Sequence, residues 1–209
     1  KFTQAKFEEK DTSDMDLSAR IGNLDETEPA PTVSQWPEET TPEAVTGRGG
    51  GLTDQAFAVK KQVITTALAL HHPDREDVVD VLSAVGGLDL AAMTGVFLGC
   101  ALQRIPAVVD GFISIVAALC ACRLNPNVKD YLFLSHASYE IGYRLAETEL
   151  GLHPCLELGM RLGEGSGCLI AFRVVEAACA VMCTMATFPE AAINDEYLTD
   201  IRAKDSFTV

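Results

Sequence analysis

Apolar residues recur at helical spacing over three stretches in the first half of the chain, and each stretch is predicted to form a helix. The stretches are residues 54–71, 77–85 and 89–103. Thr53 and Asp89 stand at the predicted starts of the first and third helices, where a side-chain oxygen can accept a free backbone N–H. A glycine-rich loop precedes the first helix, so the helical region is predicted to begin sharply.

Beyond residue 104, short apolar runs alternate with longer apolar or amphipathic segments. Strands are predicted over residues 105–110, 129–136 and 153–161, each followed by a helix of a dozen or more residues. The last of these helices, residues 168–188, is apolar on nearly all sides, which predicts a buried central helix. Strands that alternate with helices of this length indicate right-handed crossovers. We therefore expect a helix-rich α/β fold, with a parallel sheet flanked by helices in a Rossmann-like three-layer arrangement.

The chain divides into three regions by composition. Residues 1–46 carry eleven acidic and four basic residues with four prolines, and they lack a sustained apolar period. This pattern predicts an acidic, mostly irregular arm. Residues 47–188 contain all the long helices and strands and are predicted to be the α/β core, and the polar residues 189–209 are predicted to be a C-terminal tail.

Charge and cysteine usage exclude several classes of function. The chain has 16 Lys and Arg against 30 Asp and Glu, a formal net charge of −14. Nucleic-acid binding needs a clustered basic surface, so no nucleic-acid partner is expected. The seven cysteines lie mostly in apolar runs, and neither they nor the four histidines have the spacing of a zinc module. We expect reduced, buried thiols in a cytoplasmic protein without a structural metal site.

The stretch 168–188 is also long enough to span a bilayer. However, Arg173 and Glu176 lie three residues apart near its middle, where a bilayer would penalise both charges. A buried helix with one polar pair accounts for this composition better, so no membrane partner is expected.

The predicted strands bring several polar residues to one edge of the sheet. Asp110 follows the first strand, Ser138 the second, and the RLGEGSG segment (residues 161–167) the third. Ligands of parallel α/β sheets bind at this edge, beyond the carboxyl ends of the strands. Asp110 is as typical of a helix N-cap as of a ligand contact, and Ser138 is more typical of a cap. His136 is more typical of a packed or hydrogen-bonded turn residue.

Two further charged residues are linked to glycine-rich segments. Glycines on both sides of Glu164 would let the backbone approach a ligand closely, and a carboxylate at this place is suited to general-base chemistry. Lys60 lies on the helix that follows the loop containing Gly49, where its ammonium group could meet a phosphate. The alternative for Lys60 and the adjacent Lys61 is a pair of solvated surface lysines.

Five motifs occur in order and at the spacing of a known family: GRGGGL (47–52), DVLSAVGGLDLAAMTGVFLGCA (80–101), IPAVVDGFISIVAAL (105–119), YLFLSHASYEIG (131–142) and MRLGEGSG (160–167). Over residues 47–188 the chain resembles the nicotinate-nucleotide–dimethylbenzimidazole phosphoribosyltransferases, which take part in assembling the lower ligand of cobalamin. The resemblance implies transfer of phosphoribose from nicotinate mononucleotide to dimethylbenzimidazole, giving alpha-ribazole phosphate and nicotinate. It also implies a homodimer and a reaction that needs no metal and no cofactor.

The resemblance assigns roles to individual residues. Glu164 matches the general base that takes the benzimidazole N–H proton, and Asp110 would assist near the ribose or the developing charge. The remaining matched positions would bind the substrates. Leu162 and Gly163 would contact the benzimidazole, and Lys60 and Ser138 would bind the phosphate of the nucleotide. Gly49, Gly22 and Asn23 lie in glycine-containing loops that would contact the rest of the nucleotide.

The chain departs from the family pattern before residue 47. The family's long N-terminal region is not recognisable, and only residues 21–23 match its G-E-M-G-I-G-N-T-T loop. Two alternatives therefore stay open beside the enzyme. One is a truncated or non-catalytic binding or regulatory paralogue of the same family. The other is an unrelated nucleotide-binding α/β enzyme.

Overall fold

The computed structural model describes residues 40–194. Most of the predicted acidic arm lies outside the described residues, as do the candidate binding residues Gly22 and Asn23. The described residues form two compact units that divide between Cys168 and Leu169, and each unit is described separately. The first unit contains all the strands and the helices α2 to α7 in the described part of the chain.

The first half of the described chain is helical, as predicted. Its helices are α2 (Pro42–Val45), α3 (Asp54–His71), α4 (Val78–Val85) and α5 (Leu88–Leu102). The predicted cap of α3 is confirmed, because the Thr53 hydroxyl accepts the Ala56 N–H at 3.3 Å. The predicted cap of α5 is wrong. Gly87 is the N-cap, and Asp89 lies inside the first turn, where a negative charge is still favourable beside the free N–H groups.

A two-stranded parallel sheet forms the centre of the first unit. Strand β1 (Ala107–Val109) pairs with β2 (Leu132–Leu134), and Val108 is in register with Phe133. The connection between them contains α6 (Phe112–Leu124) and a 3-10 helix, η2 (Pro126–Tyr131), and α7 (Ile141–Leu150) follows β2. This is the helix-rich α/β organisation with a parallel sheet that the alternating pattern predicts.

The strands differ from the prediction in length and number. The first part of the predicted strand 129–136 belongs to η2, because the Asn125 side chain caps this helix by accepting the Asn127 N–H at 3.0 Å. The predicted third strand, 153–161, is reduced to one parallel bridge between His136 and Leu156. Two residues prevent regular pairing there: Pro154 has no N–H, and Gly159 has a φ of +62°.

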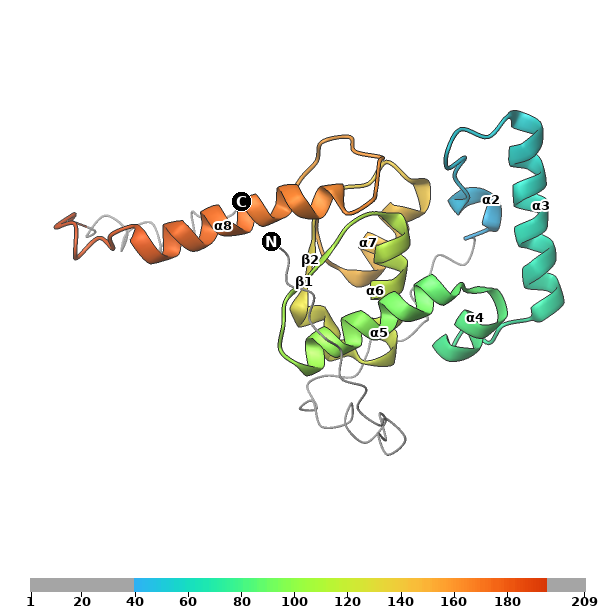
Figure 1. Cartoon of the computed structure of the whole chain (residues 1–209), viewed down its shortest axis with the longest axis horizontal. Helices are drawn as coiled ribbons and strands as arrows, with labels where there is room; N and C mark the ends of the chain where they lie inside the picture. Colours follow the sequence, from blue (N-terminus) through green and yellow to red (C-terminus); the bar gives the residue numbers. More distant parts are fainter. Residues whose placement is uncertain (1–39, 195–209) are drawn as a thin grey trace, which may run out of the picture. The chain divides into compact units, whose positions relative to one another are not determined.

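The core of the first unit lies where α6 packs against α5 and α7 (Figure 1). Small residues make this possible, because Ala117, Ala118 and Ala121 on α6 are fully buried and let its neighbours approach closely. Val109 of β1 and Tyr143 of α7 are also fully buried. This packing fixes the ends of β1 and β2, and with them the loops that carry the candidate site.

Helix α8 (Ser166–Thr184) begins in the first unit and continues into the second. The prediction that it is buried is wrong, since Leu169 is 70% and Met182 85% exposed. Apolar composition favours burial, but burial also needs a packing partner, which composition does not supply. The predicted pair is present, with Arg173 and Glu176 joined at 2.6 Å. Among the described residues, α8 is the one helix whose length and composition would suffice to cross a membrane.

Candidate active site

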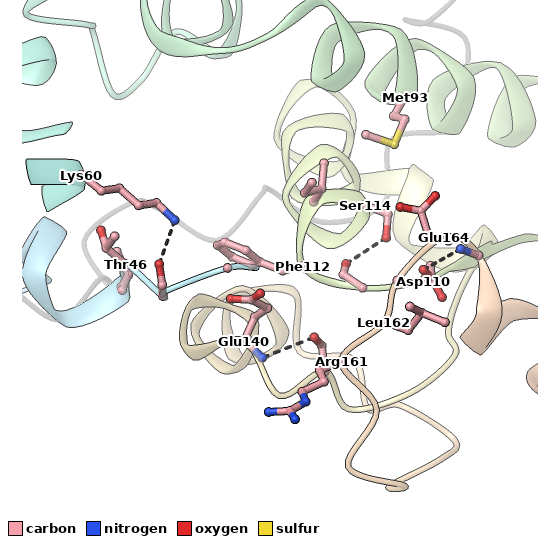
Figure 2. A pocket seen from close by; sticks show the side chains of 18 of the residues that line it. Thr46, Lys60, Met93, Asp110, Phe112, Ser114, Glu140, Arg161, Leu162 and Glu164 are labelled. Carbon is pink, nitrogen blue, oxygen red and sulfur yellow. Dashed lines mark hydrogen bonds between the residues drawn. The ribbon is translucent and has the colours of Figure 1, made fainter. Parts of the chain in front are cut away.

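A cavity of about 730 Å³ lies in the first unit, a size typical of small-molecule sites (Figure 2). Every described residue that the sequence analysis proposes for the site lines this cavity: Gly49, Lys60, Asp110, Ser138, Leu162, Gly163 and Glu164. These residues come from five separate places in the chain, between residues 49 and 164. The fold therefore brings together positions that the sequence separates by more than a hundred residues.

The loop that carries Glu164 has an unusual backbone. Gly163, Glu164 and Gly165 have φ values of +75°, +58° and +74°, so three consecutive residues are left-handed. Glycine adopts this conformation freely, but for an L-residue such as glutamate it costs about 1–2 kcal/mol. The Ser166 hydroxyl and N–H both donate to the Gly163 carbonyl, at 2.7 and 3.0 Å, and close the turn. We call residues 163–167 the glutamate turn.

Asp110 binds the glutamate turn through both of its carboxylate oxygens. It follows β1 directly, and its Oδ2 accepts the Gly165 N–H at 2.9 Å while its Oδ1 accepts the Gly167 N–H at 3.0 Å. Gly167 lies in the first turn of α8, where free N–H groups and the helix dipole favour a negative charge. The carboxylate therefore links the end of β1 to the segment that carries Glu164.

A buried polar layer lies behind Asp110. His136 is 1% exposed, and its Nδ1 lies 3.0 Å from the Ser135 Oγ and 3.8 Å from the Asp110 Oδ1. The Ser135 hydroxyl donates to the Asp110 carbonyl at 3.2 Å. His136 is thus the packed, hydrogen-bonded turn residue that the sequence analysis favours. A Cβ on Gly167 would overlap the His136 Nδ1, so only glycine fits there.

Cys168 follows this layer and is not suited to nucleophilic chemistry. Burial and the neighbouring Asp110 carboxylate raise the pKa of its thiol, and the thiol donates to the Val108 carbonyl at 3.5 Å. A reactive cysteine needs its thiolate at neutral pH, and a raised pKa disfavours that form. Within residues 40–194, no group of three or more His, Cys, Asp or Glu side chains is arranged to hold a metal ion.

Another part of the cavity wall carries the lysine. Lys60 projects from α3, and its Nζ donates to the Gly47 carbonyl at 2.8 Å (Figure 2). An ammonium group has three donors, so this bond leaves two for a ligand. The adjacent Lys61 lies 4.3 Å from the centroid of the Phe57 ring instead. The two lysines therefore have different surroundings, and it is Lys60 that lines the cavity.

Ser138 and Glu140 line the wall between β2 and α7. Ser138 is 7% exposed, and its hydroxyl accepts the Glu140 N–H at 3.4 Å. Glu140, not Ser138, is the N-cap residue of α7, so the helix-cap alternative for Ser138 is not what the structure shows.

The cavity also has lining residues that were not predicted from the sequence, among them Thr46, Met93, Phe112 and Glu140. The sequence position of Phe112 indicates a place near the site, because Phe112 ends the Asp-Gly-Phe segment that begins at Asp110. The position of Glu140 does so too, since this charged residue lies two positions after Ser138. Thr46 and Met93 lie in segments whose place on the wall depends on how α2 and α5 pack, so no local pattern identifies them.

Comparisons with known proteins show which family the chain resembles over most of its length. A family model described as Phosphoribosyltransferase matches residues 20–193. The nicotinate-nucleotide–dimethylbenzimidazole phosphoribosyltransferase of Clostridium perfringens is 53% identical over 165 residues, which are 79% of this chain and 46% of that protein. The protein of the same name from Geobacter sulfurreducens is 51% identical over 152 residues, which are 73% of this chain and 43% of that protein.

Solved structures show the same relation. The crystal structure of CobT from Thermus thermophilus superimposes with a TM-score of 0.69 at 39% identity, covering 74% of this chain and 46% of that one. The chain thus spans just under half the length of the relatives it matches. The matched region includes the glutamate turn and the end of β1, and it begins upstream of the described residues.

Proposed function

Because the chain belongs to the phosphoribosyltransferase family whose model matches residues 20–193, we propose that it transfers phosphoribose from nicotinate mononucleotide to dimethylbenzimidazole. The observation that carries the proposal is the gathering of Lys60, Ser138 and Glu164 on one cavity. A cationic group and a carboxylate on one cavity suit a substrate that is a phosphate ester and a partner that must lose a proton.

In the proposed reaction, one ring nitrogen of the benzimidazole attacks the anomeric carbon of the ribose. The bond from that carbon to the nicotinate nitrogen breaks, and nicotinate leaves with the bonding electron pair. The proton on the other benzimidazole nitrogen passes to the Glu164 carboxylate. The products are alpha-ribazole phosphate and nicotinate, and catalysis consists of positioning and one proton transfer.

Each wall of the cavity has a part in this proposal. Lys60 binds the phosphate through its two free donors, and Ser138 and the backbone at Gly49 complete that subsite. Leu162, which is 74% exposed, offers an apolar side chain to the aromatic base beside Gly163. The left-handed turn presents the Glu164 carboxylate from a short, hydrogen-bonded loop, which limits its positions before substrate arrives.

The wider properties proposed for this chain follow from its family. We propose that the protein is a homodimer in the cytoplasm. We also propose that β1 and β2 belong to a parallel sheet that is flanked by helices in a Rossmann-like three-layer arrangement. The parallel pairing of β1 and β2 across α6, and the parallel bridge from His136 to Leu156, support the sheet proposal.

The test is a turnover assay followed by chromatography, with nicotinate mononucleotide and dimethylbenzimidazole as substrates. The parent chain is expected to form alpha-ribazole phosphate, and Glu164→Ala is expected to slow its formation severely while leaving a measurable residual rate. Glu76→Gln, an exposed glutamate outside the cavity, is the control and is expected to retain activity. A folded parent chain that binds both ligands without turnover would instead indicate the non-catalytic paralogue.

A further inference from the structure

The glutamate turn needs an external restraint to persist. Glu164 has a φ of +58°, and it stands between two glycines that leave the loop free to adopt other conformations. A strained residue stays in place only when its surroundings hold it there. The bonds from Ser166 to Gly163 close the turn from inside, but they do not fix it relative to the sheet.

Asp110 supplies that restraint from the sheet. Its two oxygens accept the N–H groups of Gly165 and Gly167, which are the residues one and three positions after Glu164. The side chain of Asp110 is 14% exposed, so these charge-assisted bonds are largely shielded from water. Asp110 lines the cavity, and both of its oxygens are also bonded to the backbone of the glutamate turn.

Asp110 is itself held from behind. The Ser135 hydroxyl donates to its carbonyl, and the fully buried His136 ring occupies the space beside Gly167. The restraint therefore runs from β2 through Asp110 to the turn. A shift of this layer would move Glu164 without any change at the substrate.

We propose that Asp110 is a positioning residue that holds Glu164 in its left-handed conformation and aims its carboxylate into the cavity. This inference rests on the proposed function, which makes Glu164 the base. It replaces the expectation that Asp110 assists directly near the ribose or the developing charge.

The first test is a kinetic double-mutant cycle. Asp110→Asn keeps the size of the side chain, but its NH₂ group cannot accept a backbone N–H, so one of the two bonds is lost. We expect kcat to fall roughly 10- to 100-fold, as for a small misplacement of a catalytic group, with the KM for nicotinate mononucleotide nearly unchanged. In the Glu164→Gln background the same substitution is expected to cost less than about twofold, because it acts through Glu164.

Equal fold losses in the two backgrounds would overturn the proposal, because Asp110 would then act independently of Glu164. Asp130→Asn, an exposed aspartate outside the cavity, is the matched control and is expected to leave kcat unchanged.

The second test does not depend on turnover. Glu164→Gly removes the strain of a left-handed L-residue. The stability gained in this way exists only when Asp110 holds residue 164 in the left-handed conformation. The substitution is therefore expected to shift Tm more favourably in the parent than in the Asp110→Asn chain, by about 2–4 °C. Equal shifts in both backgrounds would contradict the restraint. A parent chain without turnover would contradict the proposed function alone, and this thermal cycle would still decide the role of Asp110.

Discussion

Two glycine-rich segments line the same cavity, and they are held in very different ways. The glycine loop, residues 47–52, is bound to α3 by the bond from Lys60 to the Gly47 carbonyl and by the exposed ion pair between Arg48 and Asp54. The glutamate turn is bound to the sheet by both oxygens of Asp110 and closed by Ser166. A Cβ on Gly50 or Gly51 of the loop, or on Gly165 of the turn, would meet no atom within 4 Å. One on Gly47 would lie 2.6 Å from the flexible Glu140 side chain, whereas one on Gly167 would overlap the buried His136 ring.

This difference matches the chemistry proposed for each segment. A phosphate is bound through charge and several donors, so the loop beside Lys60 tolerates some freedom. A general base must reach one proton, so the turn that carries Glu164 has to be fixed within a fraction of an ångström. Glycine content alone does not distinguish the two; the buried groups behind each segment do.

The largest effect is expected from Gly167→Ala. The added Cβ would overlap the His136 ring, and forcing an extra carbon into a packed site costs about 1–3 kcal/mol. Because the turn must shift to make room, turnover is expected to be lost together with this stability. Thermal unfolding and the turnover assay measure the two losses. Unchanged stability and activity would show that the glutamate turn is as loosely held as the glycine loop.

Lys60→Met is expected to act on nucleotide binding rather than on proton transfer. A hydrogen bond to a charged group contributes about 1.5 kcal/mol at the low end, which corresponds to roughly tenfold in Kd for nicotinate mononucleotide. Calorimetry measures this loss. Lys61→Met is the matched control and is expected to bind normally, because Lys61 stacks on Phe57 outside the cavity. Equal losses for both variants would remove the distinction between the two lysines.

A smaller effect is expected from Gly163→Ala, which tests backbone conformation without a clash. Gly163 has a φ of +75°, and a side chain there costs about 1 kcal/mol. Denaturant unfolding measures the change in the free energy of unfolding. A stability equal to that of the parent would show that the turn relaxes easily.

The smallest effect is expected from Gly50→Ala in the glycine loop. The site is open, and its φ is not in the left-handed region, so the change should stay within about 0.5 kcal/mol. The same unfolding measurement checks it. A loss as large as that of Gly163→Ala would mean that the loop is held as tightly as the turn.

Local patterns in the sequence predict the parts of the fold that depend on local chemistry. The Thr53 cap of α3 and the parallel pairing of β1 with β2 follow from neighbouring residues and from alternation. The gathering of Asp110 and Glu164 also follows, because loops after parallel strands meet at one edge.

Features that depend on distant packing could not be predicted in this way. The contact between Gly167 and His136 joins two segments about thirty residues apart, and no local pattern records it. The exposure of α8 shows the same limit, since an apolar helix looks alike in sequence whether or not it is covered. The third strand is lost for a local reason that the sequence does contain, because Pro154 has no N–H and Gly159 has a left-handed backbone.

The central claim is that the two glycine-rich segments bind different substrates on one cavity. The loop beside Lys60 binds the phosphate of nicotinate mononucleotide, and the glutamate turn binds dimethylbenzimidazole. A crystal structure of the Glu164→Gln variant with nicotinate mononucleotide and dimethylbenzimidazole tests it most directly. The account predicts a benzimidazole nitrogen within about 2.6–3.2 Å of the side chain at position 164, and the nucleotide phosphate at hydrogen-bond distance from the Lys60 Nζ. Both ligands bound away from this cavity, or the phosphate beside the glutamate turn, would contradict it.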